Sequence, residues 1–191
     1  MEIDQSIAQL AAELDEWFEE SGMAIESRGR ATQTEAVVRG FRMVKGLDQL
    51  KADGFAAISA LLGRRDIPTN NERAAALVKG FEFAARLADT LHDELLDIQG
   101  QTKAWGFMDA IVKRLNEFGS GRAALSVLFE HPDAGVRASA GAYLIDLMPE
   151  QVVDMLCAIR ESEHANCAHF RAHWTLLAWR REHKSRFNSL S

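Results

Sequence analysis

The chain has little of what secreted and membrane proteins need. Its two cysteines, Cys157 and Cys167, are too few for a disulfide framework. The sequence contains no run of about 18 uncharged apolar residues, which a membrane-spanning helix would need. The first residues also lack the basic start and apolar run of a secretory signal. We therefore expect a cytoplasmic protein with two reduced thiols and no contact with a membrane.

Proline and tyrosine are also scarce, with three and one in 191 residues, while Ala, Leu, Glu and Arg are abundant. This composition favours helix over sheet. With 47% hydrophobic and 26% charged residues, the chain has the balance of a folded protein, and no linker-like stretch divides it. We expect one all-α domain over 1–191, with an N-terminal half over 1–100, a second half over 101–185 and a tail over 186–191.

Basic side chains are missing from residues 1–27, which carry eight acidic ones, although the net charge of the chain is only −6. Apolar residues at spacings of three and four predict an amphipathic helix over 3–20, with Glu13, Glu16 and Glu20 on its acidic face. Such a segment repels phosphate backbones and attracts cationic surfaces, so we expect no general nucleic-acid binding and allow a basic protein partner. The simpler interpretation is a solvated helix face.

The rest of the chain repeats a pattern of helix, turn and helix. One helix follows the capping box Thr32–Glu35 and is expected to break at Ala52–Asp53–Gly54. A long helix is expected from Asn70 or Asn71 to about Ile98, and another after Gly100. With the shorter runs that follow, we expect roughly seven to nine helices.

An internal repeat connects the two halves. Ala56–Leu62 aligns with Ala123–Phe129 at an offset of 67 residues, and each block follows a helix that is ended by glycine. Repeated helical hairpins that cannot close a core alone bury their apolar faces by stacking. The repeat therefore predicts stacked antiparallel helical hairpins, as in an α-solenoid.

The segment His131–Ala140, followed by Leu144, resembles the turn and second helix of a HEAT repeat. In that family a Pro-Asp turn, here Pro132–Asp133, starts the helix, and an arginine, here Arg137, braces neighbouring turns. The stretch from about 95 to 177 is also similar to a small bacterial family of HEAT-like helical domains of unknown function. The resemblance implies a HEAT-like α-solenoid in the C-terminal half and no chemistry.

One cluster has the spacing of metal ligands: His164, Cys167, His169 and His173. The last two are four residues apart, so they share a helix face and could bind a metal through two imidazoles. However, Cys167 also falls on an apolar stripe with Phe170, Trp174 and Leu177. A core cysteine with histidines at the edge of the stripe is the more economical interpretation, so we expect no metal and no cofactor.

No nucleophile elbow, phosphate-binding loop or dinucleotide-binding turn is present, so the sequence gives no support for an enzyme. Trp179 is a candidate partner contact, because it adjoins Arg180 and Arg181 and such side chains are enriched at binding hot spots. The other interpretation is core packing, which we expect for the other three tryptophans, Trp17, Trp105 and Trp174.

Helical stacks expose long faces and most often serve as binding scaffolds. The sequence therefore predicts a non-catalytic protein-binding module. Its most concrete form is a bacterial immunity protein that neutralises a basic toxin through Glu13, Glu16 and Glu20. The alternatives are a metal-dependent enzyme that uses the His/Cys cluster, and a nucleic-acid-binding protein like the HEAT-like DNA glycosylases.

Overall fold

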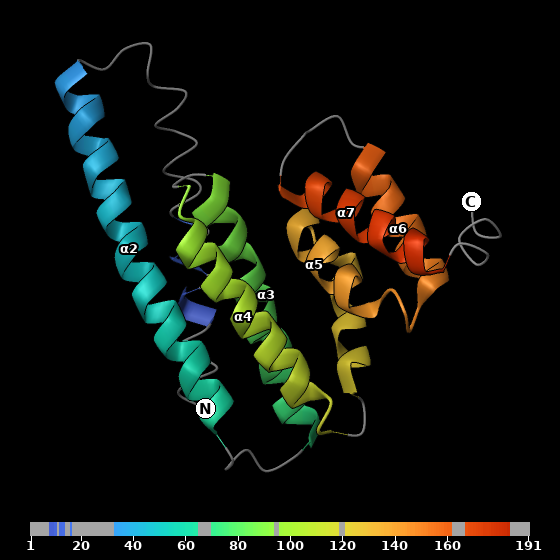
Figure 1. Ribbon diagram of the computed structural model, residues 1–191. Coiled ribbons are helices and arrows are strands. Elements are labelled where there is room, and N and C mark those ends of the chain that lie inside the picture. The colour runs from blue at the N-terminus through green and yellow to red at the C-terminus, as the bar shows by residue number, and fades with distance from the viewer. Residues whose placement is uncertain are drawn as a thin grey trace. The chain divides into compact units, whose positions relative to one another are not determined.

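The computed structural model describes residues 8–10, 12–13, 16, 33–64, 70–93, 96–118, 121–161 and 167–183. Every regular element in these ranges is a helix and none is a strand (Figure 1), so the predicted all-α class is confirmed. Among the described helices, none is both long enough and apolar enough to cross a membrane.

The chain divides into two compact units, Met1–Arg64 and Arg65–Ser191. Their boundary falls in the polar segment before Pro68, which the sequence marks as a loop, and not near residue 100 where the two halves were expected to meet. The helices on either side of residue 96 therefore belong to the same unit. The expectation of one domain over 1–191 stays a prediction.

In the first unit, α2 (Gln33–Gly63) is one continuous helix, and the break expected at Gly54 is absent. A single helical period runs through that glycine, because Leu47, Leu50, Gly54, Ile58 and Leu61 are all buried and follow one another at spacings of three and four. A glycine inside a helix costs only about 1 kcal/mol. Burial of the whole stripe outweighs that cost.

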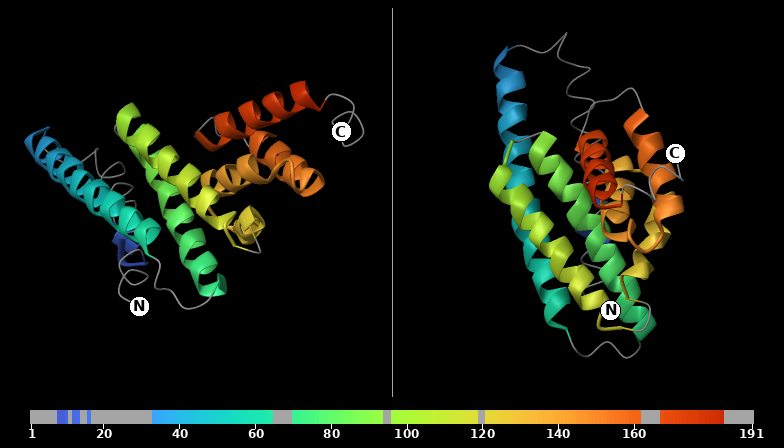
Figure 2. Two further views of the ribbon diagram at one scale, coloured as in Figure 1. Left: turned by 60° about the horizontal axis from the view of Figure 1, so that its bottom comes forward. Right: turned by 45° about the vertical axis from the view of Figure 1, so that its right-hand side comes forward.

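In the second unit, α3 (Asn70–Asp93) and α4 (Ile98–Leu115) lie side by side (Figures 1 and 2). The helix expected to reach Ile98 ends earlier, and Leu96 adopts a left-handed conformation with φ 51° that no α-helix can contain. Asp97 then caps α4, since its carboxylate accepts a hydrogen bond of 2.8 Å from the Gly100 backbone N–H. The turn signal is this aspartate, and Gly100 lies inside the helix.

The remaining elements are η2 (Gly121–Glu130), α5 (Ala134–Leu144), α6 (Pro149–Glu161) and α7 (Cys167–Glu182). α5, α6 and α7 pack against one another, and α3 contacts α4, η2, α5 and α7. This central position explains why α3 is buried on most sides, with fully buried side chains that include Phe81, Phe83, Leu87 and Leu91. Ala84, Ala85 and Ala88 on the same helix let its neighbours approach closely.

The two segments that align as an internal repeat adopt different helices. Ala56–Leu62 forms the last turns of the α-helix α2, whereas Ala123–Phe129 lies within the 3₁₀-helix η2. A 3₁₀-helix has three residues per turn, so the same spacing of side chains points in different directions in the two segments. The likeness in sequence therefore does not extend to the local backbone.

Candidate functional site

A stripe of polar side chains runs along α3 on the side that faces the C-terminal helices. Glu82, Arg86, Asp89 and His92 follow one another at spacings of four, three and three, so they share one helix face. Each contacts a side chain from later in the chain. The pairs are Glu82 with His131 at 3.2 Å, Arg86 with Asp133 at 4.0 Å, Asp89 with Arg171 at 2.5 Å and His92 with Cys167 at 2.9 Å. We call the first three of these pairs the polar seam.

Arg171 is the centre of the polar seam. Its guanidinium group binds both oxygens of the Asp89 carboxylate, at 2.5 and 3.3 Å, and the two side chains are only 14% and 17% exposed. It also donates hydrogen bonds to the Gly135 carbonyl oxygen at 3.1 Å and to Ser139 Oγ at 2.7 Å. A buried ion pair is stable only when further hydrogen bonds satisfy its remaining groups, and this one ties α3, α5 and α7 together.

Gly135 makes room for this ion pair. A Cβ atom built on it would overlap the Asp89 carboxylate, and Asp133 Oδ1 would lie 3.1 Å away. The same Asp133 oxygen caps α5 by accepting a hydrogen bond of 2.7 Å from the Gly135 backbone N–H. Only a residue without a side chain lets the Asp89 carboxylate approach the first turn of α5 so closely.

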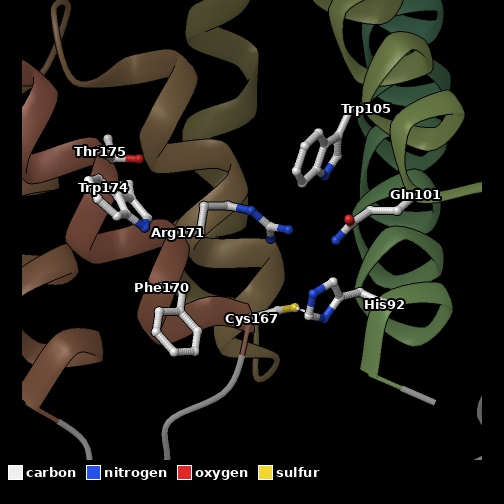
Figure 3. Close-up of a pocket in the computed structure, with 8 residues that line it drawn as sticks. All are labelled: His92, Gln101, Trp105, Cys167, Phe170, Arg171, Trp174 and Thr175. Carbon is white, nitrogen blue, oxygen red and sulfur yellow. Dashed lines mark hydrogen bonds between the residues drawn. The ribbon is translucent and has the colours of Figure 1, made fainter. Parts of the chain in front are cut away.

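A pocket of about 300 Å³ opens beside the polar seam (Figure 3). One wall comes from α3 and α4 and the other from α7, so all of its lining lies in the second unit. Figure 3 shows the Arg171 guanidinium reaching between the two walls. The pocket volume is at the lower limit for small-molecule sites and suits one large side chain or a compact ligand. The lining residues are His92, Gln101, Trp105, Cys167, Phe170, Arg171, Trp174 and Thr175.

Two of the lining residues form a thiol–imidazole pair. The Sγ atom of Cys167 lies 2.9 Å from Nδ1 of His92 (Figure 3). Cys167 is the first residue of α7, so its thiol sits at a helix N-terminus. Contact with an imidazole and with the positive end of a helix dipole both stabilise the thiolate form of a cysteine.

Gln101 is the polar group of the opposite wall. Its side chain points into the pocket (Figure 3), and the residue is 5% exposed. Among the described residues, none forms a hydrogen bond with its carboxamide. Its amide atoms face the space of the pocket, so an occupant that offers a hydrogen-bonding group could bind them.

Three aromatic side chains surround the mouth of the pocket: Trp105 on α4, and Phe170 and Trp174 on α7. They are 42%, 54% and 61% exposed. We call these three residues the aromatic rim. The expectation that Trp105 and Trp174 lie in the core is wrong. The buried stripe of α7 is instead made by Ala168, Ala172, Leu176 and Trp179.

The buried face of α7 differs from the predicted one because of the size of its side chains. Alanines at 168 and 172 allow α7 to approach α5 and α6 closely, and the ion pair of Arg171 fixes the adjacent face against α3. The larger Phe170 and Trp174 are left outside the packed interface. The apolar stripe that the sequence predicts, with Phe170 and Trp174, is therefore not the buried face of this helix.

The predicted metal cluster is only partly within the described residues, because His164 lies outside them. Cys167 contacts His92, whereas the His169 and His173 rings pack edge-on against the neighbouring rings of Phe170 and Trp174. In the part of the chain that the structure describes, no group of three or more His, Cys, Asp or Glu side chains could hold a metal ion.

The predicted partner contacts have different positions. Glu13 and Glu16 are exposed on helical residues of the first unit, and Glu20 lies outside the described residues. Trp179 is 3% exposed and stacks on the ring of His183 with centroids 5.1 Å apart. A side chain buried to this extent offers no surface to a partner, so Trp179 is corrected from a candidate contact to a core residue.

Tyr143 on α5 makes a further link to α4. Its hydroxyl donates a hydrogen bond of 2.6 Å to Asp109 Oδ1, and its ring packs edge-on against Phe81 with centroids 5.5 Å apart. Burial raises the pKa of Tyr143 well above its usual value, and the hydrogen bond and negative charge of Asp109 raise it further. The phenol is therefore held in its neutral form.

Comparison of the chain with protein-family models, with curated proteins and with solved structures finds no significant match in any of the three.

Sequence reasoning missed His92 and Gln101. His92 is an isolated histidine near the end of a long helix, and its partner Cys167 is 75 residues away in the sequence. Gln101 looks like an ordinary polar residue of a helix that starts at Ile98.

Proposed function

We propose that this protein is a protein-binding module that contacts its partner through the aromatic rim of the pocket. The observation that carries the proposal is the exposure of Trp105, Phe170 and Trp174 around one pocket. Large exposed apolar patches commonly mark interaction sites, and tryptophan is enriched among the side chains that contribute most to binding.

The charge of the two helices that carry the rim suggests the chemistry of the partner. Apart from Arg171, which is paired with Asp89, α4 and α7 carry five Lys or Arg side chains and two acidic ones, in a chain whose net charge is −6. The occupant that fits is an acidic protein segment that inserts one aromatic or large aliphatic side chain into the pocket. Complementary charge speeds association, and the inserted side chain provides the apolar burial.

We propose stacked antiparallel hairpins of the HEAT-like α-solenoid type as the architecture that presents this surface. Support comes from Arg137, whose guanidinium donates hydrogen bonds to the carbonyl oxygens of His131 at 2.5 Å and Pro132 at 2.8 Å. This is a bracing role like the one that the resemblance implies. Gly141 adds support, because a Cβ there would lie 2.8 Å from Met155 Cε, so α5 and α6 pack closely.

The test is a displayed library of random peptides panned on the protein, followed by calorimetry with the enriched peptides. We expect enrichment of peptides with an aromatic residue flanked by Asp or Glu, and at least tenfold weaker binding to Trp174→Ala. The matched control is Val127→Ala, which removes an exposed apolar side chain of η2 outside the pocket. Failure to enrich any such peptide, or equal binding to both variants, would refute the role of the rim.

A second candidate function concerns the first unit. Glu13 and Glu16 are exposed, as expected for an acidic surface. We propose on this basis that the protein neutralises a basic toxin in the bacterial cytoplasm, as an immunity protein does. Fast, salt-sensitive association with a basic enzyme is the signature of such a surface.

This candidate requires a basic protein that co-purifies from the native host and loses its toxic activity when bound. A variant with Glu13, Glu16 and Glu20 replaced by Lys should fail to hold that protein, while Trp174→Ala should retain it. Retention by the charge-reversed variant would rule out the acidic surface. Salt-sensitive retention of RNA or DNA by the wild type would favour the nucleic-acid alternative instead.

A further inference from the structure

The two walls of the pocket hold a nucleophile, a base and a hydrogen-bond donor. Cys167 Sγ lies 2.9 Å from His92 Nδ1 at the N-terminus of α7, which is the environment of reactive cysteines. The second cysteine offers a comparison. Among the described residues, Cys157 lies inside α6, is half-buried as Cys167 is, and forms no hydrogen bond.

Gln101 is an independent sign that the pocket receives a ligand. Its carboxamide is directed into the pocket, the residue is 95% buried, and no described residue hydrogen-bonds to it. A carboxamide N–H in the same pocket as a nucleophile can bind the oxygen of a carbonyl group and stabilise the negative charge that forms there during attack. The pocket thus contains the three groups that acyl transfer uses.

We propose that Cys167 is an acyl-acceptor nucleophile, with His92 as its base and Gln101 as the donor to the carbonyl oxygen of the substrate. The thiol proton passes from Sγ to His92 Nδ1, and the sulfur lone pair attacks the carbonyl carbon of an ester or thioester. The bond from this carbon to the leaving oxygen or sulfur breaks, and the leaving group takes the proton from His92. The product is a thioester on Cys167, which water hydrolyses to a carboxylic acid and the free thiol.

The walls define the class of acyl group. The aromatic rim and the volume of about 300 Å³ suit a compact apolar acyl chain or an aromatic acyl group. The guanidinium of Arg171 is held by Asp89, Gly135 and Ser139, so it does not select an anionic substrate. This activity goes beyond the proposed protein binding, since it needs no partner.

The test uses 4-nitrophenyl butyrate as the acyl donor and the purified full-length protein. Release of 4-nitrophenolate is followed by absorbance, and the acylated residue is identified by peptide mass spectrometry. We expect the butyryl group on Cys167 to form on the order of 10²-fold faster than on Cys157 in the same molecules. Unfolding the protein in urea should remove this difference, because both thiols then have the same surroundings.

Variants separate the roles within the site. His92→Ala and Gln101→Met should each slow acylation of Cys167 on the order of 10²-fold, while Cys157→Ser should leave it unchanged. Equal acylation of the two cysteines in the folded wild type would overturn the proposal without any variant. So would a wild-type rate in His92→Ala. The peptide-binding test of the aromatic rim is independent of both results.

Discussion

The polar seam and the pocket lie next to each other on the same side of α3, and they are built in opposite ways. In the seam, every charged group of the Arg171–Asp89 pair is buried and hydrogen-bonded, and Gly135 leaves no spare space. In the pocket, Gln101 is buried without a hydrogen bond to any described residue, and the rings around it are exposed. The seam therefore stabilises the fold, whereas the pocket is left incomplete for an occupant.

Among the substitutions that test this difference, Asp89→Ala should cause the largest loss of stability. It leaves the Arg171 guanidinium buried without its carboxylate, so we expect the free energy of unfolding to fall by about 3–5 kcal/mol. Urea denaturation followed by circular dichroism measures it. The matched control is Asp154→Ala on the exposed face of α6, which should change stability by no more than about 0.5 kcal/mol. Similar losses in the two variants would contradict the structural role of the seam.

Gly135→Ala should have the next largest effect. The added methyl group overlaps the Asp89 carboxylate, so we expect a loss of about 1–3 kcal/mol in the free energy of unfolding. Gly106 on α4 is the control, because nothing lies within 4 Å of a Cβ built there. Gly106→Ala should stabilise the protein by about 0.4–1 kcal/mol. If both changes stabilise, the close approach at Gly135 is not required.

Tyr143 gives a pH-dependent test, and it is the only tyrosine of the chain. Its pKa is raised in the folded protein, so the unfolded state loses the phenolic proton first. The stabilisation from this group is complete below about pH 10, the usual value for tyrosine, and is lost as the pH rises above it. Ultraviolet absorbance should show tyrosinate only at higher pH in the folded protein than in the urea-unfolded one.

Tyr143→Phe removes the hydrogen bond to Asp109 and should cost about 1 kcal/mol at neutral pH. It should also remove the tyrosine component of the decline in stability above about pH 10. Coincident titrations of the folded and unfolded wild type would contradict the raised pKa of Tyr143.

Gln101→Met should change stability the least, and unlike the changes to Asp89, Gly135 and Tyr143 it should not destabilise the protein. It replaces an amide that no described residue hydrogen-bonds with an apolar side chain of similar shape, so the free energy of unfolding should stay the same or rise by up to about 1 kcal/mol. Thermal unfolding of the purified protein measures it. A loss of more than about 1 kcal/mol would mean that Gln101 supports the fold, and that the pocket resembles the seam.

The sequence predicted the all-α class because helical periodicity and the scarcity of proline are local properties. Pro149 opens α6, as proline favours the first turn of a helix, and apolar residues at spacings of three and four run through α7. The predicted end of α3 was too late, because apolar residues continue to Ile98 and only the cap at Asp97 marks the turn. Local patterns were sufficient where a helix end has its own sequence signal.

The seam and the pocket could not be predicted in this way. Glu82, Arg86 and Asp89 have the spacing of a solvated helix face, and their partners are 47 to 82 residues away in the sequence. The pairs exist only because α5 and α7 pack on that face. Likewise, the exposure of Trp174 depends on which side of α7 the arginine of the ion pair selects.

The order of charges along the polar seam also fixes how far α3 can slide along its neighbours. The alanines of α3 distinguish poorly between positions one turn apart, since small side chains look alike, so the larger and the charged side chains must fix the alignment. Here such a shift would place Glu82 against Asp133 and Arg86 against Arg171, and a shift in the other direction would place Asp89 against Asp133. Like charges would meet in a partly buried layer in either case. The seam thus favours one register of α3 along its neighbours, and it aligns the two walls of the pocket to within less than one helical turn.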